Sequence, residues 1–549
     1  MSIDRRRFLA RSVAGVASAA LANARVLCAA DQSVAVGSEP QILIDDWAVQ
    51  RADDLKRTLH QPRKQGLIKE ADGSDWQRGG VYLGNAVCRD NAGIFHMTYR
   101  YYWWDAALEK VRQIGVDKAH WFHETVGYAT SDDGIRWSKP ELGRFDAPSR
   151  FSASNSFPFE TPEAFSRRNN FGYPIPFAYD LQANGNVSDP NKRFLFQVVE
   201  QRDATHPFAK PLDSQLYFAA DWPDIREAQW KDKLTPIPKG TLSPRGFSTI
   251  CGYDYAAKEW FMTCQDVIQN WLKRDGRDIA RYASPDLVSW TGPELVLPVA
   301  QDESRKATDH IEYMDLWGNR IGGPRTGAWL GQLLIFHSDR TNPEYQTPRM
   351  PNVWRKGTTE LRLVISRDAG RSWQRVGDHQ AWLPHHDEDD GFDRLINGTC
   401  PVRVGDEMRY YYSCWNGDHL VFNRDGSTHY PNRLRNNCTA WATLRINGQC
   451  SLDANDQGGQ LLTKPLRFDN SLLAVNLSAA KGSLRVEVQD DSGNPVEGFA
   501  SADCVPATGD GLALPVQWRD NRDLRKLAGR AVRLRFELRR GSLYAFQFV

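Results

Sequence analysis

The sequence lacks the features that mark several common protein classes. After its first thirty residues it has no apolar run long enough to span a bilayer, and 69 basic residues nearly balance 68 acidic ones. The formal net charge of +1 provides no electrostatic footprint for nucleic acid or for an anionic membrane. The nine cysteines form no CxxC pair, which argues against a structural zinc site. Helical periodicity is scarce, so most of the chain is predicted to be β-structure.

The first thirty residues differ in composition from the rest of the sequence. "DRRRFLA" from Asp4 is followed by the short alanine-rich stretch "SVAGVASAALA", which is too short to cross a membrane. Arg5 and Arg6 with Phe8 and Leu9 match a twin-arginine export signal. Residues 1–30 are therefore predicted to be a signal peptide, and the protein is expected to be periplasmic or secreted.

A short motif recurs in the remainder. "SDDGIRW" begins at Ser131, "SPDLVSW" at Ser284 and "SRDAGRSW" at Ser366, and each follows an apolar-aromatic run typical of a strand. The first interval, 153 residues, is about twice the second, 82 residues, so one further copy is expected between Ser131 and Ser284. "YFAADWPDIREAQW" (217–230) stands there as a degenerate copy, and "CTAWATLRINGQCSL" (438–452) is expected to be a fifth.

Five units of about 80 residues, each with about four strands, predict a five-bladed β-propeller. We place it at residues 31–447. Residues 448–549 alternate apolar and polar positions between Gly, Asp and Asn turns, which predicts a small antiparallel β-sandwich. The predicted fold class is thus all-β. Cys251 and Cys264 flank a hairpin turn, and a disulfide between them is one alternative in an exported protein.

Ser284, Asp286, Leu287 and Trp290, with the related motifs, resemble blade signatures of the five-bladed glycoside hydrolases of families 32 and 43. The resemblance implies a glycosidase that needs no cofactor, although a structural Ca²⁺ in the central funnel, as in some family 43 relatives, is compatible with oxygen ligands. The "WMNDPNG" and "RDP" motifs of family 32 are absent here, so its catalytic residues are not carried over.

Glycoside hydrolysis needs two carboxyl groups, and strand starts at the mouth of a propeller are where we look for them. The strongest segment is "ATDHIEYMDLWGNRIGG", in which Glu312 is the predicted general acid and Asp309 a further candidate. Asp75 in "GSDWQRGG" is the predicted base or nucleophile, and Asp393 in "DDGFDRLING" is its rival. An exposed Glu312 paired with arginine is the structural alternative. No metal ligand is predicted, because adjacent side chains in "HHDEDD" point apart on a strand.

Aromatic and basic side chains near predicted strand ends are expected to bind the sugar. They are Arg78, Arg100, Trp103, Trp271, Arg274, His310, Trp317, Arg325 and Trp415. The predicted function is that of an exported glycosidase acting on a poly- or oligosaccharide. Two alternatives stay open: a carbohydrate-binding propeller without catalysis, and a sialidase-like enzyme that uses several arginines to bind an acidic sugar. The sugar, the linkage and the oligomeric state are not determined by the sequence.

Overall fold

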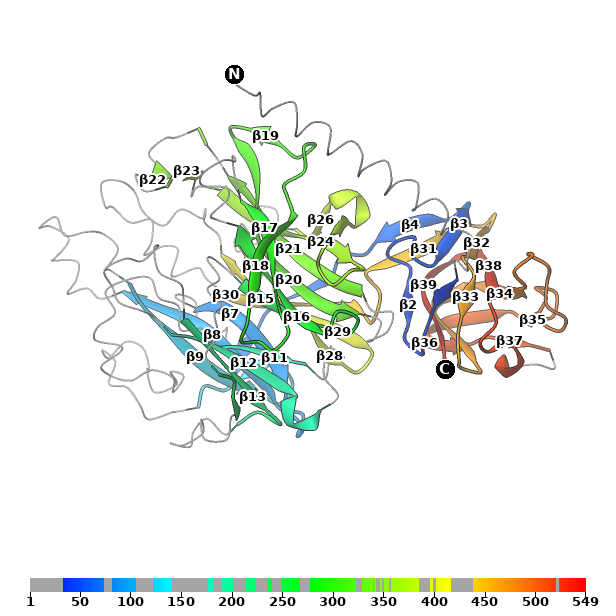
Figure 1. The fold of residues 1–549 in the computed structure, drawn as a ribbon, viewed down its shortest axis with the longest axis horizontal. Helices are drawn as coiled ribbons and strands as arrows, with labels where there is room; N and C mark the ends of the chain where they lie inside the picture. Colours follow the sequence, from blue (N-terminus) through cyan, green and yellow to red (C-terminus); the bar gives the residue numbers. More distant parts are fainter. Residues whose placement is uncertain are drawn as a thin grey trace, which may run out of the picture. The chain divides into compact units, whose positions relative to one another are not determined.

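A computed structural model of the chain describes residues 33–73, 81–104, 122–140, 176–181, 189–200, 213–223, 235–238, 248–266, 277–321, 328–338, 340–341, 346–347, 350–354, 357–384, 395–397, 401–415, 438–519 and 523–549. Apart from three single-turn 3₁₀ helices, the regular structure of these residues consists of β-strands (Figure 1). No helix in this part of the chain is long and apolar enough to cross a membrane.

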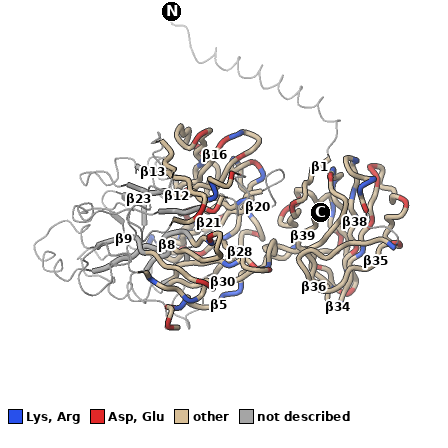
Figure 2. The backbone as a smooth tube through the Cα atoms, turned by 90° about the horizontal axis from the view of Figure 1, so that it is seen from below, with Lys and Arg blue, Asp and Glu red and all other residues tan. Residues whose placement is uncertain are grey.

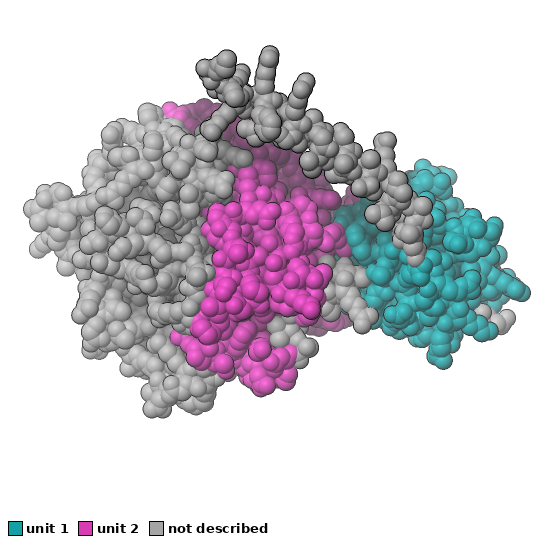
Figure 3. Space-filling view, viewed as in Figure 1, with its two compact units in different colours: residues 1–56, 452–549 teal, residues 57–451 magenta. Residues whose placement is uncertain are grey.

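The chain divides into two compact units, coloured separately in Figure 3. Unit 1 comprises residues 1–56 and 452–549, and unit 2 comprises residues 57–451. The described residues 33–56 and 452–549 therefore belong to one unit. The sequence predicts that residues 31–56 belong to the propeller, but strands β2 (Gln41–Ile42) and β3 (Val49–Asp53) pair within the main sheet of unit 1.

Unit 2 is a five-bladed β-propeller, as predicted. Blade 1 consists of β7 (Val81–Arg89), β8 (Phe95–Trp104) and β9 (Phe122–Ser131). Blade 2 consists of β11 (Pro176–Asp180), β12 (Phe194–Glu200), β13 (Asp213–Ala219) and β14 (Thr235–Pro236). Blade 3 consists of β15 (Ser248–Asp254), β16 (Glu259–Asp266), β17 (Asp278–Ser284) and β18 (Thr291–Leu297).

Blade 4 is the largest. It contains β19 (Arg305–Lys306), β20 (Asp309–Ile321), β21 (Ala328–Ser338), β24 (Gly357–Ser366) and β25 (Gln374–Arg375), and β26 (Ala381–Leu383) also pairs with β24. Blade 5 contains β27 (Leu395–Asn397), β28 (Val402–Val404), β29 (Glu407–Trp415) and β30 (Cys438–Arg445). Its outer strand is β5 (Arg63–Leu67), which comes from the start of unit 2 and closes the ring.

The shorter elements of unit 2 lie outside these blades. They are β6 (Lys69–Glu70), which pairs with β10 (Arg136–Trp137), the pair β22 (Gln346–Thr347) and β23 (Met350–Trp354), and the 3₁₀ helices η4 (Pro190–Lys192) and η7 (Gly377–His379).

The repeated motifs are the turns that follow the third strand of a blade. In the first, Asp133 Oδ1 accepts the backbone N–H groups of Ile135 and Arg136 at 2.7 and 2.8 Å and the Ser131 hydroxyl at 3.1 Å. Asp286 and Asp368 make the corresponding bonds in blades 3 and 4. The side chain thus satisfies backbone groups that a tight turn would leave without partners.

The aromatic residue of each turn packs against the preceding blade. Trp137 contacts Tyr411 of blade 5, and Trp222, within the degenerate copy, stacks on His96 of blade 1 with ring centroids 4.7 Å apart. Trp373 belongs to the hydrophobic cluster between blades 3 and 4. A Cβ atom added at Gly331 would lie 2.9 Å from the Trp373 ring, so glycine is needed there to admit the indole. The regular spacing of the motifs therefore reflects a packing contact that recurs between neighbouring blades.

Cys251 and Cys264 are not joined by a disulfide. Cys264 lies opposite Ser248, three residues before Cys251 on the paired strand. The hairpin predicted from the sequence is present, but its register holds the two cysteines apart along the strands, so the geometry of a cross-strand bridge is not met.

Unit 1 is also built of strands. Its main sheet contains β2, β3, β32 (Gly459–Thr463), β34 (Leu473–Gln489), β36 (Ala507–Pro515), β38 (Arg533–Arg539) and β39 (Gly541–Phe548). The sheet also includes β4 (Lys56–Leu59) and β31 (Cys450–Ala454), each of which has residues in both units. Smaller elements are β1 (Val34–Ala35) with β33 (Leu466–Arg467), β35 (Cys504–Val505) with β37 (Gln517–Trp518), and η8 (Arg525–Leu527).

The long strand β34 organises this sheet. Its first half pairs with β39, its second half pairs with β38, and β36 follows it with a register shift between Ala479 and Leu484. Apolar residues from both ends of the chain form one core cluster, in which Phe468 and Phe548 stack with ring centroids 4.0 Å apart. The two-layer sandwich expected for residues 448–549 stays a prediction.

Candidate functional site

The antiparallel register of the blades brings the starts of their first strands to one side of the propeller. We call this side the upper face, defined by the starts of β7, β11, β15, β20 and β27, where β20 counts as the first long strand of blade 4 because β19 has two residues. The second strand of each blade ends there, and the third strand starts there. The Ser-Asp turns follow the third strands and therefore lie on the opposite, lower face. The first strands of propeller blades line a central channel, so the upper face is where the predicted site should lie.

The predicted residues fall into three groups. Asp309, His310, Glu312 and Trp317 lie on β20 with their side chains described. For Arg100 and Trp103 on β8 and Trp415 on β29, the structure gives the strand position. Asp75, Arg78, Trp271, Arg274, Arg325 and Asp393 lie outside the described residues. Arg325 stands between the end of β20 and the start of β21, two strand ends that meet at the lower face.

The side chain of Glu312 is completely buried. Its Oε1 lies 3.4 Å from Nη2 of Arg340, and its Oε2 lies 3.4 Å from Nη1 of Arg277. The Arg277 guanidinium also lies over the Phe336 ring, and its backbone carbonyl accepts the N–H of Tyr313 at 3.0 Å. Both carboxyl oxygens of Glu312 therefore face arginine, and the side chain is closed off from solvent. The structure thus pairs Glu312 with two arginines from other segments, neither of them foreseen from the sequence.

Asp309 and Glu312 lie on opposite faces of blade 4. Glu312 pairs with Phe336 and shares its face with His310, whereas Asp309 has the opposite parity. The two carboxylates are therefore not a facing pair, although they are only three residues apart. His310 and Trp317 are 2% and 3% exposed, so neither ring presents an open face to a sugar in this conformation.

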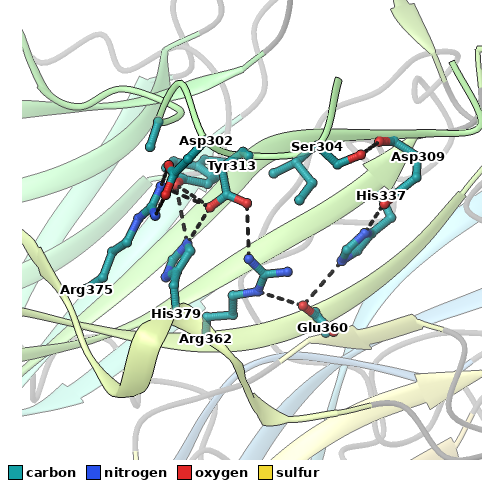
Figure 4. A network of polar contacts seen from close by, with 12 residues as sticks. Asp302, Ser304, Asp309, Tyr313, His337, Glu360, Arg362, Arg375 and His379 are labelled. Atoms are coloured by element: carbon teal, nitrogen blue, oxygen red, sulfur yellow. Dashed lines mark hydrogen bonds and ion pairs between the residues drawn. The ribbon is translucent and has the colours of Figure 1, made fainter. Parts of the chain in front are cut away.

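Asp309 belongs to a chain of ion pairs across blade 4 (Figure 4). Its Oδ1 lies 2.6 Å from Nδ1 of His337 on β21, and the His337 Nε2 lies 3.3 Å from Oε1 of Glu360 on β24. Arg362 donates from Nε to the same Glu360 oxygen at 2.7 Å. Arg362 Nη1 also lies 3.3 Å from Glu303. Charges therefore alternate in sign from the start of β20 into the blade.

The end of this series of ion pairs that is farthest from Asp309 fixes the segment that leads into β19. Glu303 Oε1 lies 2.8 Å from Nε2 of His379 and accepts the Tyr313 hydroxyl at 3.2 Å. Arg375 pairs with both Glu303 and the exposed Asp302. The Ser304 hydroxyl donates to the backbone carbonyl of Asp309. The start of β20 is thus held through its backbone as well as through its side chain.

The titration of this cluster follows from its alternating charges. Burial disfavours the His337 cation, but hydrogen bonding and attraction to Glu360 and Asp309 outweigh burial and raise the pKa of His337. Burial opposes ionisation of Glu360, yet His337 and Arg362 lower the pKa of Glu360 to about 2. Burial of Glu303 is likewise outweighed by His379, Arg362 and Arg375, which lower the pKa of Glu303.

His337, Glu360, Arg362 and Glu303 are not predicted from the sequence as site residues. The first three stand in the strand-like segments "LLIFHS" and "TELRLVI", where polar side chains interrupt apolar runs, whereas Glu303 stands in the polar segment "QDES". Such interruptions are a usable signal, because a polar residue in a buried strand needs a partner. Within the described residues there is no group of three or more His, Cys, Asp or Glu side chains that could hold a metal ion.

Charged residues of both signs are interspersed over the described parts of both units (Figure 2). This pattern does not single out a face for a strongly charged polymer.

Comparison with known proteins gave structural matches alone. No family model and no curated protein matches the sequence. Among solved structures, the chain is similar to a beta-1,2-mannobiose phosphorylase from Listeria innocua, at 12% identity and a TM-score of 0.39, over 69% of this chain and 94% of that one.

Two further matches have comparable scores. One is an N-acetylgalactosamine deacetylase from F. plautii, at 13% identity and a TM-score of 0.38, over 71% and 96% of the two chains. The other is a glycoside hydrolase family 43 arabinoxylan arabinofuranohydrolase from Bacillus subtilis, at 10% identity and a TM-score of 0.33, over 86% and 96%. At these values the matches do not identify an activity.

Proposed function

We propose that the protein is an exported glycoside hydrolase whose catalytic carboxyl groups lie on the upper face of the propeller. In this reaction the bond between the anomeric carbon and the leaving oxygen breaks, and the oxygen of a water molecule bonds to that carbon. One carboxyl group gives a proton to the leaving oxygen, while a carboxylate takes a proton from water or attacks the carbon first. The proposal that the protein is exported is based on the twin-arginine motif at Arg5 and Arg6.

One observation carries the proposal. Asp309 is the first residue of β20, and its side chain is 43% exposed although His337 holds it at 2.6 Å. An accessible carboxylate with a fixed orientation at the start of a first strand is what the reaction requires. Because Glu312 lies on the other face of the sheet, the second catalytic carboxyl group must come from another strand.

Two residues are suited by their position in the sequence to supply it. Asp393 stands two residues before β27, and Asp75 stands six residues before β7. We propose that one of them acts with Asp309. Glu312 then influences the site only electrostatically, through its ion pairs with Arg277 and Arg340.

A carbohydrate-binding propeller without catalysis is the second candidate. The specific observation in its favour is that Glu312, the predicted general acid, is fully buried between Arg277 and Arg340 and is not exposed to a substrate.

The mature protein should be assayed on a panel of chromogenic glycosides and natural polysaccharides that includes acidic sugars. We expect release of reducing ends from one class of substrate. Asp309→Asn should lower kcat by about 10²-fold or more. Asp286→Asn alters a turn on the lower face and is the matched control, expected to retain kcat.

Glu312→Gln, Asp75→Asn and Asp393→Asn complete the set and show which other carboxyl group is needed. Binding to a polysaccharide without hydrolysis would favour the second candidate. Full activity of Asp309→Asn would remove the site proposed here.

A further inference from the structure

We infer that His337, backed by Glu360, is the positioning residue that holds Asp309 as the base of the reaction. The inference rests on the proposed hydrolase function and specifies the machinery of the same site. In the step concerned, Asp309 removes a proton from the attacking water, whose oxygen bonds to the anomeric carbon. A carboxyl group from another strand gives its proton to the leaving oxygen, so one proton is taken and one is given.

The first support is the way Asp309 is fixed. Its backbone pairs with Lys306 across the β19–β20 hairpin, and its carbonyl accepts the Ser304 hydroxyl. Its Oδ1 is held by Nδ1 of His337 at 2.6 Å, while no described residue donates to Oδ2. One carboxylate oxygen is therefore anchored, and the other has no donor among the described residues, on a side chain that is 43% exposed. A base that removes a proton from water needs this combination of fixed orientation and one free oxygen.

The second support is the burial gradient behind Asp309. Side-chain exposure falls from 43% at Asp309 to 21% at His337 and 10% at Glu360. The order is an exposed acidic group, an imidazole and a buried carboxylate. In a catalytic triad the buried carboxylate likewise orients the imidazole, and the imidazole serves the group that reacts. Here the imidazole contacts a carboxylate instead of a hydroxyl, so it orients Asp309 and is not itself a catalytic residue.

The third support is that Glu360 is itself held in place. Arg362 donates to Glu360 at 2.7 Å, and Glu303 binds Arg362 from the other side (Figure 4). The charged groups that face His337 are Asp309 from β20 and Glu360 from β24, with Arg362 adjacent to Glu360. If these ion pairs served only to join the strands, the series would not need to end in an exposed carboxylate with an oxygen that no described residue contacts.

Kinetics of four variants test the inference on the substrate found in the panel. In His337→Ala we expect kcat to fall by about 10²-fold, with KM changed by less than about threefold, because orientation of the base is lost and substrate binding is not. His337→Asn keeps an N–H donor near Asp309 and should recover part of kcat. Glu360→Gln should lower kcat less than His337→Ala does. Asp302→Asn removes a charge at the far end of the same series of ion pairs and should retain kcat.

The pH profile separates positioning from a structural role. Wild-type kcat should decline on the alkaline side as His337 loses its proton. Glu360→Gln should move this decline to lower pH, because one of the two carboxylates that favour the cation is removed. In His337→Asn the decline should disappear. The imidazole titration measured by NMR in wild type, Asp309→Asn and Glu360→Gln is a second readout that requires no substrate.

The outcomes are distinguishable. If wild type hydrolyses no substrate, the proposed function fails and the role of His337 falls with it. If wild type is active but His337→Ala keeps kcat within about twofold, the inference is overturned and the function stands. The same holds if His337→Asn keeps the wild-type alkaline decline. If His337→Ala does not fold, His337→Asn, Glu360→Gln and the imidazole titration decide.

Discussion

The acidic side chains on the two faces of the propeller accept hydrogen bonds at different sequence separations. On the lower face, Asp133 and Asp368 each bond groups that lie within four residues. On the upper face, Asp309 meets His337 across 28 residues, and Glu303 meets Arg362 across 59. Local turns recur from blade to blade, whereas the series of ion pairs that runs from Asp309 to Glu303 lies in blade 4. The comparison indicates that the repeat supplies the scaffold and that departures from the repeat supply the site.

The third turn shows how far the repeat can vary. "SRDAGRSW" has one residue more than its two relatives. In the shorter turns the indole N–H donates to the carbonyl of Gly134 or Leu287, at 3.2 and 2.9 Å. The indole nitrogen of Trp373 is buried without a partner among the described residues. The extra residue therefore costs one hydrogen bond and leaves the Asp368 contacts intact.

The largest expected effect is on the lower face. Trp137→Ala removes a fully buried ring that packs on Phe95 and Tyr411, and should lower the unfolding free energy by about 3–5 kcal/mol. Urea denaturation would measure it, with Trp290→Ala, a less buried equivalent, as a milder comparison. A loss below about 1 kcal/mol would mean that the blade contacts do not depend on these rings.

On the upper face, Glu312→Gln is expected to be the most destabilising single charge removal. It leaves the Arg277 and Arg340 guanidiniums beside a neutral amide and should cost about 3 kcal/mol. Thermal unfolding gives the test, with Asp302→Asn, a change at an exposed acid, as the control. An unchanged Tm would show that the two arginines find other partners.

A smaller effect is expected for Asp133→Ala on the lower face. The change removes the acceptor of two backbone N–H groups and should cost about 1–2 kcal/mol near neutral pH. Burial of Asp133 opposes ionisation, but the N–H groups of Arg136 and Ile135 outweigh it and lower the pKa of Asp133. Its contribution is therefore present above the unfolded pKa of 3.8 and is lost as pH falls. The stability difference between the variant and wild type should shrink in acid.

The smallest expected effect is the pH dependence supplied by His337. Its pKa is raised in the folded state, so its contribution is complete below the unfolded value of 6.5 and is lost as pH rises through the folded value. As pH rises above 6.5, wild-type unfolding free energy should therefore fall more steeply than that of His337→Asn. Parallel curves for the two proteins would contradict the paired state of the imidazole.

The blade number could be predicted because three blades carry a local signal and the spacing of these signals leaves room for two further blades. In those three blades, Ser, Asp and Trp within eight residues specify a turn and a buried ring without reference to the rest of the chain. The outer strand of blade 5 could not be predicted in this way. β5 is a short, half-exposed segment, "RKQGL", with no apolar alternation, and its partner Ala440 lies in a distant part of the chain. Strands β2 and β3 of unit 1 were assigned to the wrong domain for the same reason.

The candidate site rests in part on the sequence. The segment around Asp309 and Glu312 directs attention to β20, since carboxylates among aromatic residues are unusual in a buried segment. The opposite orientation of the two side chains follows from a spacing of three on a strand and was available from the sequence. The partners of Asp309 were not, because the meeting of His337 and Glu360 depends on the register of β20, β21 and β24. In addition, a register shift between Tyr313 and Asp315 interrupts the alternation of side chains along β20. The face on which a residue beyond the shift lies therefore cannot be found by counting from Asp309.

The late arrival of the partner of β5 has a consequence for biosynthesis. β5 is made among the first strands of unit 2, but Ala440 and its neighbours leave the ribosome only after all other blades have been translated. Until then β5 is an unpaired edge, which is a template for aggregation. Truncated chains that end before β30 should consequently be far more prone to aggregate than chains that end just after it.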